Sequence, residues 1–508
     1  MSPQQSDPDR SAAPSGPPSH QDRAVMATRW GHSERFVPSR VMQPLQRLLA
    51  QESAGGFALL AAAMVALVWA NSPWHGGYQR LWSTPFELRL GDRGPLHLSL
   101  TLKGFVNDVL MTFFFYLAAL EIKRELVHGS FRDRKAAALP ALAALGGMVV
   151  PALIYVAWNR GGQASGGWGI PMATDIAFAV AVVSLLGPRM PISARAFLLT
   201  LAVADDLGGI AVIAVFYTDD LAFGWLALAA LALGFSAVAQ RLGVRSYAPY
   251  LALGLVSWFA LHESGVHATV AGVALGLLTP ANPFLAVRHF ASHARPLVAR
   301  VEASVEDRVL TEEEADANET GLRDLVRLSV ETMSPLERHL AWAGPWVAFG
   351  IAPVFALANA GVRVVGSSLP NPLTDPVVLG PALGLLIGKP IGILIFTYLA
   401  VRSGLGRLPT GVRWPVMTGL AATAGVGFTV ALFITELSFD PVSGATGLTE
   451  RAKLGVLGGS VLSALLGYTL LRLAANSLPG PAATGEVPQR TNQSPGSPVG
   501  VSAHNRLA

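Results

Sequence analysis

The sequence has 508 residues, of which only 14% are charged and 51% are hydrophobic. Soluble domains carry about 25% charged residues, so these proportions and a mean hydropathy of +0.45 exclude a string of ordinary soluble domains. High hydrophobicity also excludes an intrinsically disordered chain. The chain has no cysteine, which rules out disulfides, iron–sulfur clusters and thiolate metal sites, and we expect no cofactor.

Two polar tails enclose a long apolar region. Residues 1–50 and 476–508 are rich in Pro and Ser and are predicted to be disordered cytoplasmic tails. Residues 51–475 contain twelve apolar runs, each about as long as a helix that crosses a hydrocarbon core of about 30 Å. The runs are 53–71, 104–122, 137–158, 172–187, 196–217, 221–240, 247–261, 266–280, 343–362, 378–401, 415–436 and 453–473. We therefore expect an all-α polytopic membrane protein with twelve transmembrane helices.

Lysine and arginine residues are distributed unevenly between the connecting loops. With both termini placed in the cytoplasm, the inside loops hold 19 of the 37 basic residues and the outside loops hold eight. Such a bias is the positive-inside rule of membrane proteins. The net charge of +4 and the pI near 9.5 therefore reflect membrane topology, and no nucleic-acid partner is expected.

Two of the loops have distinctive sequences. The first outside loop alternates apolar and polar residues on both sides of a Gly/Pro turn, which predicts a β-hairpin over residues 86–100. The loop over residues 281–342 contains eleven acidic residues and seven arginines. We interpret this second loop as a solvated cytoplasmic linker.

Four charged residues lie deep within predicted spans: Asp175, Asp205, Asp206 and Lys389. A charged side chain at the centre of a spanning helix costs roughly 2.5–3.5 kcal/mol on insertion scales. Structural ion pairing between helices is the alternative interpretation. Stability alone does not require two adjacent carboxylates, which repel each other, so these residues indicate a functional site.

The adjacent pair of aspartates suggests competition between two ions. About 100° of helix rotation separates consecutive side chains, so Asp205 and Asp206 can face different surroundings. Closely spaced carboxylates titrate as a coupled unit, and their oxygens suit a hard cation. A pair that accepts either a proton or a cation couples the two fluxes. Lys389 is expected to neutralise one carboxylate while the cation is absent.

Helix-breaking residues occur in two of the spans. Gly167, Gly169 and Pro171 stand at the start of span 4, and Gly425-Val-Gly-Phe-Thr429 interrupts span 11. Close helix packing would explain glycines in either span alone. Interrupted spans at matching positions of two halves are typical of secondary transporters. Asp175, beside the first break, is expected to offset the positive ends of half-helices.

The sequence resembles the NhaA family of sodium–proton antiporters over about residues 53–473. The motifs that carry the resemblance include Ala173-Thr-Asp-Ile-Ala-Phe-Ala179, Asp205-Asp-Leu-Gly208, Ser264-Gly-Val-His-Ala-Thr269, Gly388-Lys-Pro390 and Gly425-Val-Gly-Phe-Thr429. The resemblance implies a multi-pass protein of the bacterial inner membrane with inverted-topology repeats. It further implies that spans 4 and 11 are discontinuous and cross at mid-membrane.

The same resemblance implies roles for particular residues. Asp205 and Asp206 would bind Na⁺ and protons in competition, and Lys389 would pair with Asp205. Asp175 would compensate the charges of the crossed half-helices, with Thr174 nearby. The family exports Na⁺ or Li⁺, takes in more protons than cations and works by alternating access. Its members form homodimers partly through the first outside hairpin, which here is residues 86–100.

Regulation by pH is less well specified by the sequence. Glu121, Arg124 and His267 are candidates, although a structural role at a helix end is the ordinary interpretation of each. The family commonly has histidines just before the Pro-Trp of span 9, whereas this chain has His339-Leu-Ala-Trp-Ala-Gly-Pro-Trp346 after a longer acidic insertion.

Two other classes of function remain to be weighed. A sodium- or proton-coupled symporter for a small solute would need a pocket for an organic substrate, and no signature of one is present. An intramembrane aspartyl enzyme would need a Gly-x-Gly-Asp stretch, which the sequence lacks. We therefore expect a transporter and no enzymatic activity.

Overall fold

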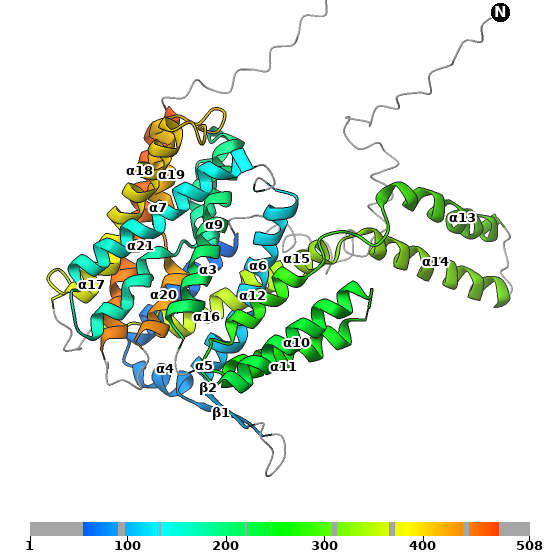
Figure 1. Ribbon diagram of the computed structural model, residues 1–508, viewed down its shortest axis with the longest axis horizontal. Coiled ribbons are helices and arrows are strands. Elements are labelled where there is room, and N and C mark those ends of the chain that lie inside the picture. Colours follow the sequence, from blue (N-terminus) through cyan, green and yellow to red (C-terminus); the bar gives the residue numbers. More distant parts are fainter. Residues whose placement is uncertain are drawn as a thin grey trace, which may run out of the picture.

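The computed structural model describes residues 54–89, 97–129, 131, 134–218, 221–244, 246–306, 312–364, 371–439 and 447–476. These residues form a bundle of helices with one two-stranded sheet at one end (Figure 1). Both predicted tails lie outside the described residues, apart from Asn476.

The helices and strands follow one another along the whole described chain. The first half comprises α3 (Ala54–Ala70), α4 (His75–Trp82), β1 (Pro85–Arg89), β2 (His97–Thr101), α5 (Leu102–Phe105), α6 (Met111–Val127), α7 (Arg134–Trp158), the 3₁₀ helix η5 (Gln163–Met172), α8 (Ile176–Ser184), the 3₁₀ turn η6 (Gly187–Arg189), α9 (Ile192–Phe216), α10 (Phe223–Arg241), α11 (Tyr247–Glu263) and α12 (Thr269–Leu278). The second half comprises α13 (Val287–Glu306), α14 (Glu312–Thr332), α15 (Pro335–Trp346), α16 (Ala352–Asn359), α17 (Pro376–Leu383), α18 (Lys389–Arg402), α19 (Trp414–Thr423), α20 (Phe428–Ser438) and α21 (Leu448–Asn476).

Three of the long helices contain a π-helical turn. These turns are η3 (Val106–Leu110) between α5 and α6, η7 (Val347–Ile351) between α15 and α16, and η8 (Gly384–Gly388) between α17 and α18. Each turn joins its two neighbours into one continuous helix of 25 to 27 residues.

Seven helices in the described part of the chain are long and apolar enough to cross a membrane. The number rises to ten if each of three bent helix pairs counts as one span. The protein is therefore a multi-pass membrane protein. All twelve predicted runs coincide with helices, but α11 and α12 have only 17 and 10 residues and are not among the ten. Twelve spans thus stays a prediction.

Two of the bent pairs coincide with the glycine-rich runs. The axes of η5 and α8 meet at 44°, and those of α19 and α20 meet at 45°. The break in the first pair covers residues 173–175, and the break in the second covers 424–427. The first pair begins nine residues before the predicted span because the Gly- and Pro-containing segment forms a 3₁₀ helix instead of a loop.

The two strands confirm the predicted β-hairpin. β1 and β2 pair antiparallel, with Phe86 opposite Leu100, while the connecting turn lies outside the described residues. Helix α5 follows β2 directly and is capped by Thr101, whose hydroxyl oxygen accepts from the backbone N–H of Gly104 at 3.0 Å. The hairpin extends from the end of the bundle that also holds α4 and α5 (Figure 1), which we call the hairpin end.

Much of the region predicted to be a linker is helical. Helices α13 and α14 form a pair that projects sideways from the bundle (Figure 1). Leu325 and Leu328, three residues apart, are half-buried on one face of α14, and this helical spacing of apolar residues is consistent with a helix in a highly charged segment. The backbone N–H of Leu285 donates to the carbonyl of Glu331 at 3.1 Å, so the two ends of the projection meet.

The membrane helix after this projection begins at Pro335, eight residues before the predicted start of span 9. Ser334 caps it by accepting from the backbone N–H of Glu337 at 3.2 Å. Proline is favoured in the first turn of a helix because its missing N–H is not needed there. The charged first turn therefore belongs to the same helix as the apolar run.

Helices α7 and α18 pack closely in the centre of the bundle. A Cβ atom added to Gly392 would lie 2.0 Å from the carbonyl oxygen of Gly146, which no side chain tolerates. Glycine at both positions therefore allows the two backbones to touch. This contact fixes the first turn of α18, where Lys389 lies.

Candidate functional site

The two helix breaks lie side by side. The backbone N–H of Asp175 donates to the carbonyl of Val426 at 2.6 Å. The hydroxyl of Thr174 donates to the carbonyl of Ala424 at 2.9 Å. The extended segment at 173–175 and the turn at 424–427, some 250 residues apart in sequence, thus satisfy backbone groups that neither helix pair satisfies for itself.

The carboxylate of Asp175 serves the first turns of two helices. One oxygen accepts from the backbone N–H of Phe178 at 3.0 Å and caps α8. The other accepts from the backbone N–H and the hydroxyl of Thr429, in the first turn of α20, at 3.1 and 2.8 Å. The start of a helix carries partial positive charge, so this buried anion lies where two positive helix ends converge.

Lys389 binds at the carboxyl end of a helix, which carries partial negative charge. Its ammonium group donates to the carbonyl of Met172, the last residue of η5, and to the carboxylate of Asp205 at 2.5 Å. Its side chain is 1% exposed and that of Asp205 is 2% exposed. The hydroxyl of Thr174 shares its single proton between the carbonyl of Ala424 and the same oxygen of Asp205, which lies 2.6 Å away. One carboxylate oxygen thus accepts from both a lysine and a threonine.

One carboxylate oxygen of each aspartate in the pair has no hydrogen-bond partner among the described residues. The Oδ1 atoms of Asp205 and Asp206 are buried and accept no hydrogen bond from any described residue. Asp206 is 7% exposed. Its carboxylate interacts electrostatically with the carboxylates of Asp205 and Glu121 and with the ammonium group of Lys389. A buried polar atom without a partner is costly, so these oxygens are where a proton or a cation would be stabilised.

The structure brings the predicted residues together around the two helix breaks. Asp175, Thr174, Asp205 and Lys389 are joined by the contacts above, and Asp206 is the next residue along α9. The sequence analysis did not single out Thr429 as a site residue. Its signal was its position directly after the glycine break of span 11, where a helix must start again.

The candidates for pH regulation are spread over both ends of the bundle. Glu121 and Arg124 lie half-buried near the end of α6, and His267 lies half-buried just before α12. Helices α6 and α12 run in the same direction, because Gly272 lies against Thr112 and the ammonium of Lys123 reaches the carbonyl of Leu277. His267 is therefore at the end opposite Glu121.

The donor set suits a small hard cation better than a transition metal. Within the described ranges, no three His, Asp or Glu side chains are grouped as metal ligands. The available ligands are carboxylate and carbonyl oxygens, which hard monovalent and divalent cations prefer. The cation in question would be cargo, and the same oxygens accept protons.

A charged cluster where two bent helix pairs meet inside a multi-pass membrane protein is an arrangement of secondary transporters. The chain matches the family described as Na⁺/H⁺ antiporter 1 over residues 46–471, and it belongs to that family.

Several relatives align with this chain over nearly their whole length. A protein named Na(+)/H(+) antiporter NhaA from Rhodopirellula baltica is 44% identical over 432 residues, which are 85% of this chain and 94% of the relative. Na(+)/H(+) antiporter NhaA 3 from Frankia alni is 44% identical over 451 residues, 89% of this chain and 93% of the relative. Na(+)/H(+) antiporter NhaA from Rhizobium meliloti is 42% identical over 447 residues, 86% and 96% of the two chains.

Proposed function

We propose that this chain exports Na⁺ or Li⁺ in exchange for external protons, and that Asp205 and Asp206 are the site shared by the two ions. Membership of a Na⁺/H⁺ antiporter family and the names of the relatives support the reaction. One observation carries the assignment of the site. Lys389 and Thr174 hold one oxygen of Asp205, whereas the Oδ1 atoms of Asp205 and Asp206 are buried and have no described partner.

Competition for these oxygens accounts for coupled transport. A proton and a cation neutralise the same buried negative charge, so occupancy by one removes the reason for the other to bind. In the cation-free state Lys389 supplies the neutralising charge to Asp205. Arrival of Na⁺ makes this ammonium group unnecessary, and the oxygen that it occupied becomes a cation ligand. Two carboxylates also allow two protons to return for one cation, which makes the exchange electrogenic.

Alternating access requires helices that can change direction at the site. We assign the pairs η5–α8 and α19–α20 as the discontinuous spans 4 and 11 of two inverted repeats. Asp175 compensates the positive helix ends at the crossing, and Lys389 and Thr174 donate to the carbonyls that end η5 and α19. Such compensation lets short half-helices remain stable in a low-dielectric environment.

The distribution of basic residues supports the orientation. We place the protein in the bacterial inner membrane with both termini in the cytoplasm, so that the hairpin end is external. The β-hairpin over residues 86–100 then supplies an outer contact between two copies in a homodimer. The exposed side chain of Phe86 on β1 provides apolar surface for this contact.

Exchange by the purified protein in liposomes tests the reaction. With no organic solute present, an outward Na⁺ or Li⁺ gradient should drive proton uptake, and a K⁺ gradient should not. A small-solute symporter would show no sodium-dependent proton flux under these conditions. The variant Asp316→Asn, which neutralises an exposed carboxylate on α14, serves as the matched control for substitutions at the aspartate pair and should exchange normally.

A further inference from the structure

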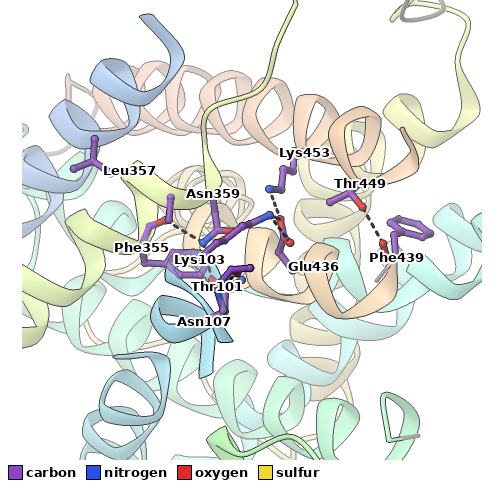
Figure 2. Close-up of polar contacts among 12 residues, drawn as sticks. Thr101, Lys103, Asn107, Phe355, Leu357, Asn359, Glu436, Phe439, Thr449 and Lys453 are labelled. Atoms are coloured by element: carbon purple, nitrogen blue, oxygen red, sulfur yellow. Dashed lines mark hydrogen bonds and ion pairs between the residues drawn. The ribbon is translucent and has the colours of Figure 1, made fainter. Parts of the chain in front are cut away.

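A second charged cluster lies at the hairpin end, and the exchange site does not use it. Lys103 at the start of α5 donates to both carboxylate oxygens of Glu436 at 2.8 and 2.7 Å. Lys453 in α21 contacts one oxygen of the same carboxylate. Figure 2 shows both ammonium groups next to the carboxylate of Glu436. We call these three residues the hairpin-end cluster. Lys103 is 31% exposed, whereas Glu436 is 14% and Lys453 is 8% exposed.

The cluster fastens the end of α20 opposite to the exchange site. Glu436 is seven residues after Thr429, so the two side chains lie on nearly the same face of α20 and about 10 Å apart along its axis. Thr429 contacts Asp175, and all residues from Phe428 to Thr435 are buried. One short helix thus has a charged contact at each end, the first at the crossing and the second at the hairpin end.

The two lysines differ in how they are connected to α20. Helix α21, which carries Lys453, packs along α20. Helix α5, which carries Lys103, is the first turn of the continuous helix Leu102–Val127 and packs against β1, β2 and α4. The bond between Lys453 and Glu436 therefore lies within one packed pair of helices. The bond between Lys103 and Glu436 joins that pair to a different part of the molecule.

A cavity of about 470 Å³ opens beside the cluster. Lys103, Glu436 and Lys453 all line it, together with Tyr78 and Arg363. Water and ions that enter this cavity reach the ion pair directly. Beyond it, Asn359 donates to Asn107 at 2.8 Å (Figure 2).

We propose that the Lys103–Glu436 ion pair is a latch that holds α20 against α5 and closes the route from this cavity to the crossing of the broken helices. The latch opens when the exchange site turns towards the hairpin end, and α20 then stays with α21. The inference deepens the proposed antiport, since it assigns the contact that must part for exchange on this side.

Stability alone does not account for the presence of Lys103 in the hairpin-end cluster. A buried ion pair is frequently no more stabilising than apolar residues of similar volume. The cluster contains two cations and one anion, so removal of Lys103 leaves a balanced pair, Lys453 and Glu436. The variant Lys103→Met should therefore fold, and it should change the opening of the latch.

The absence of cysteine from the chain allows a direct test by thiol labelling. A single cysteine, Leu432→Cys, lies in the buried part of α20 between its two charged contacts. A membrane-impermeant thiol reagent is applied separately to intact cells and to everted vesicles, so that both faces are sampled. Ser99→Cys on the exposed part of β2 marks the hairpin face. Thr435→Cys provides a second, nearly isosteric reporter if Leu432→Cys does not fold.

Lys103→Met should raise the labelling rate of Leu432→Cys from the hairpin face by about tenfold, which corresponds to about 1.4 kcal/mol in the population of the open state. Lys103→Arg, which retains the ion pair, should restore the slow rate. Arg80→Met removes a cation from exposed surface of α4 at the same end and should leave the rate unchanged. An unchanged rate in Lys103→Met, or an equal rise in Arg80→Met, would overturn the proposal.

Labelling does not depend on transport, so the two proposals fail separately. If wild-type protein in liposomes shows no Na⁺-driven proton flux while Lys103→Met accelerates labelling, the antiport proposal is wrong and the latch stands. If exchange is normal and labelling is unaffected, the latch is wrong and the antiport stands.

Discussion

Asp175 and Thr429 are 254 residues apart in sequence, and a single carboxylate oxygen of Asp175 accepts from both the backbone N–H and the hydroxyl of Thr429. The contact joins the start of α20 to the start of α8 and so ties together the second halves of two bent helix pairs. Together with the bond between the backbone N–H of Asp175 and the carbonyl of Val426, this connection holds the two helix breaks side by side.

The hydroxyl of Thr429 should contribute measurably to the stability of the crossing. Thr429→Val removes a hydrogen bond to a buried carboxylate, a contact that contributes about 1.5–3 kcal/mol in soluble proteins, but it keeps the backbone N–H bond. Thermal unfolding in detergent should show a lower Tm for Thr429→Val and a Tm near that of the wild type for Thr429→Ser. Equal Tm values for the two variants would show that the hydroxyl is unimportant.

The pairing of Lys389 with Asp205 leads to a reciprocal prediction. Lys389→Met leaves Asp205 buried beside a neutral side chain, and loss of one partner of a buried pair costs about 3–5 kcal/mol. The double variant Lys389→Met/Asp205→Asn removes both charges and should recover much of the lost free energy of unfolding. Exchange should remain abolished in both. A double variant no more stable than the single one would contradict the direct pairing.

Close approach of α7 and α18 should make one glycine indispensable. Gly392→Ala places a methyl group against the backbone of Gly146, and overpacking of this kind costs typically about 1–3 kcal/mol. Gly234→Ala in α10 meets no atom within 4 Å and is the matched control. We expect Gly392→Ala to lower both Tm and exchange rate. The same loss in Gly234→Ala would mean that any added methyl group is harmful.

The projecting α13–α14 pair should be separable from the exchange site. Because Leu285 and Glu331 are hydrogen-bonded, a short linker can replace residues 287–332. The shortened protein should retain Na⁺/H⁺ exchange, and the pH at which exchange is half-maximal should shift, since the projection brings many charges to the start of α15. An unchanged pH profile measured in everted vesicles would assign pH sensing to another region.

The charged residues of the candidate site were visible in the sequence. Asp175, Asp205, Asp206 and Lys389 stand out because ionised groups in apolar spans are rare and costly. The helix breaks near residues 173 and 425 were indicated by glycine and proline. The pairing of Lys389 with Asp205 was implied only by the family resemblance, because spacing along the chain does not show which helices are neighbours.

Contacts between segments that are far apart in the sequence could not be predicted from the sequence. Lys103 and Glu436 are 333 residues apart, and in the sequence Lys103 was only one of the eight basic residues of the predicted outside loops. Glu436 did carry a signal, namely an acidic side chain at the end of an apolar run. The helical structure of α13 and α14 was obscured by their many charges, although apolar residues at helical spacing were present. The π-helical turn at Gly384–Gly388 leaves no periodic pattern in the sequence.

The central claim is that Asp206, together with Asp205, binds the exchanged ions, and one comparison tests it most directly. Wild-type protein, Asp206→Asn and Asp316→Asn are reconstituted in liposomes at matched density, and proton flux is recorded after a Na⁺ gradient is imposed. The account predicts that Asp206→Asn inserts normally and shows no Na⁺-driven proton flux, while Asp316→Asn matches the wild type. Undiminished exchange by Asp206→Asn would contradict it.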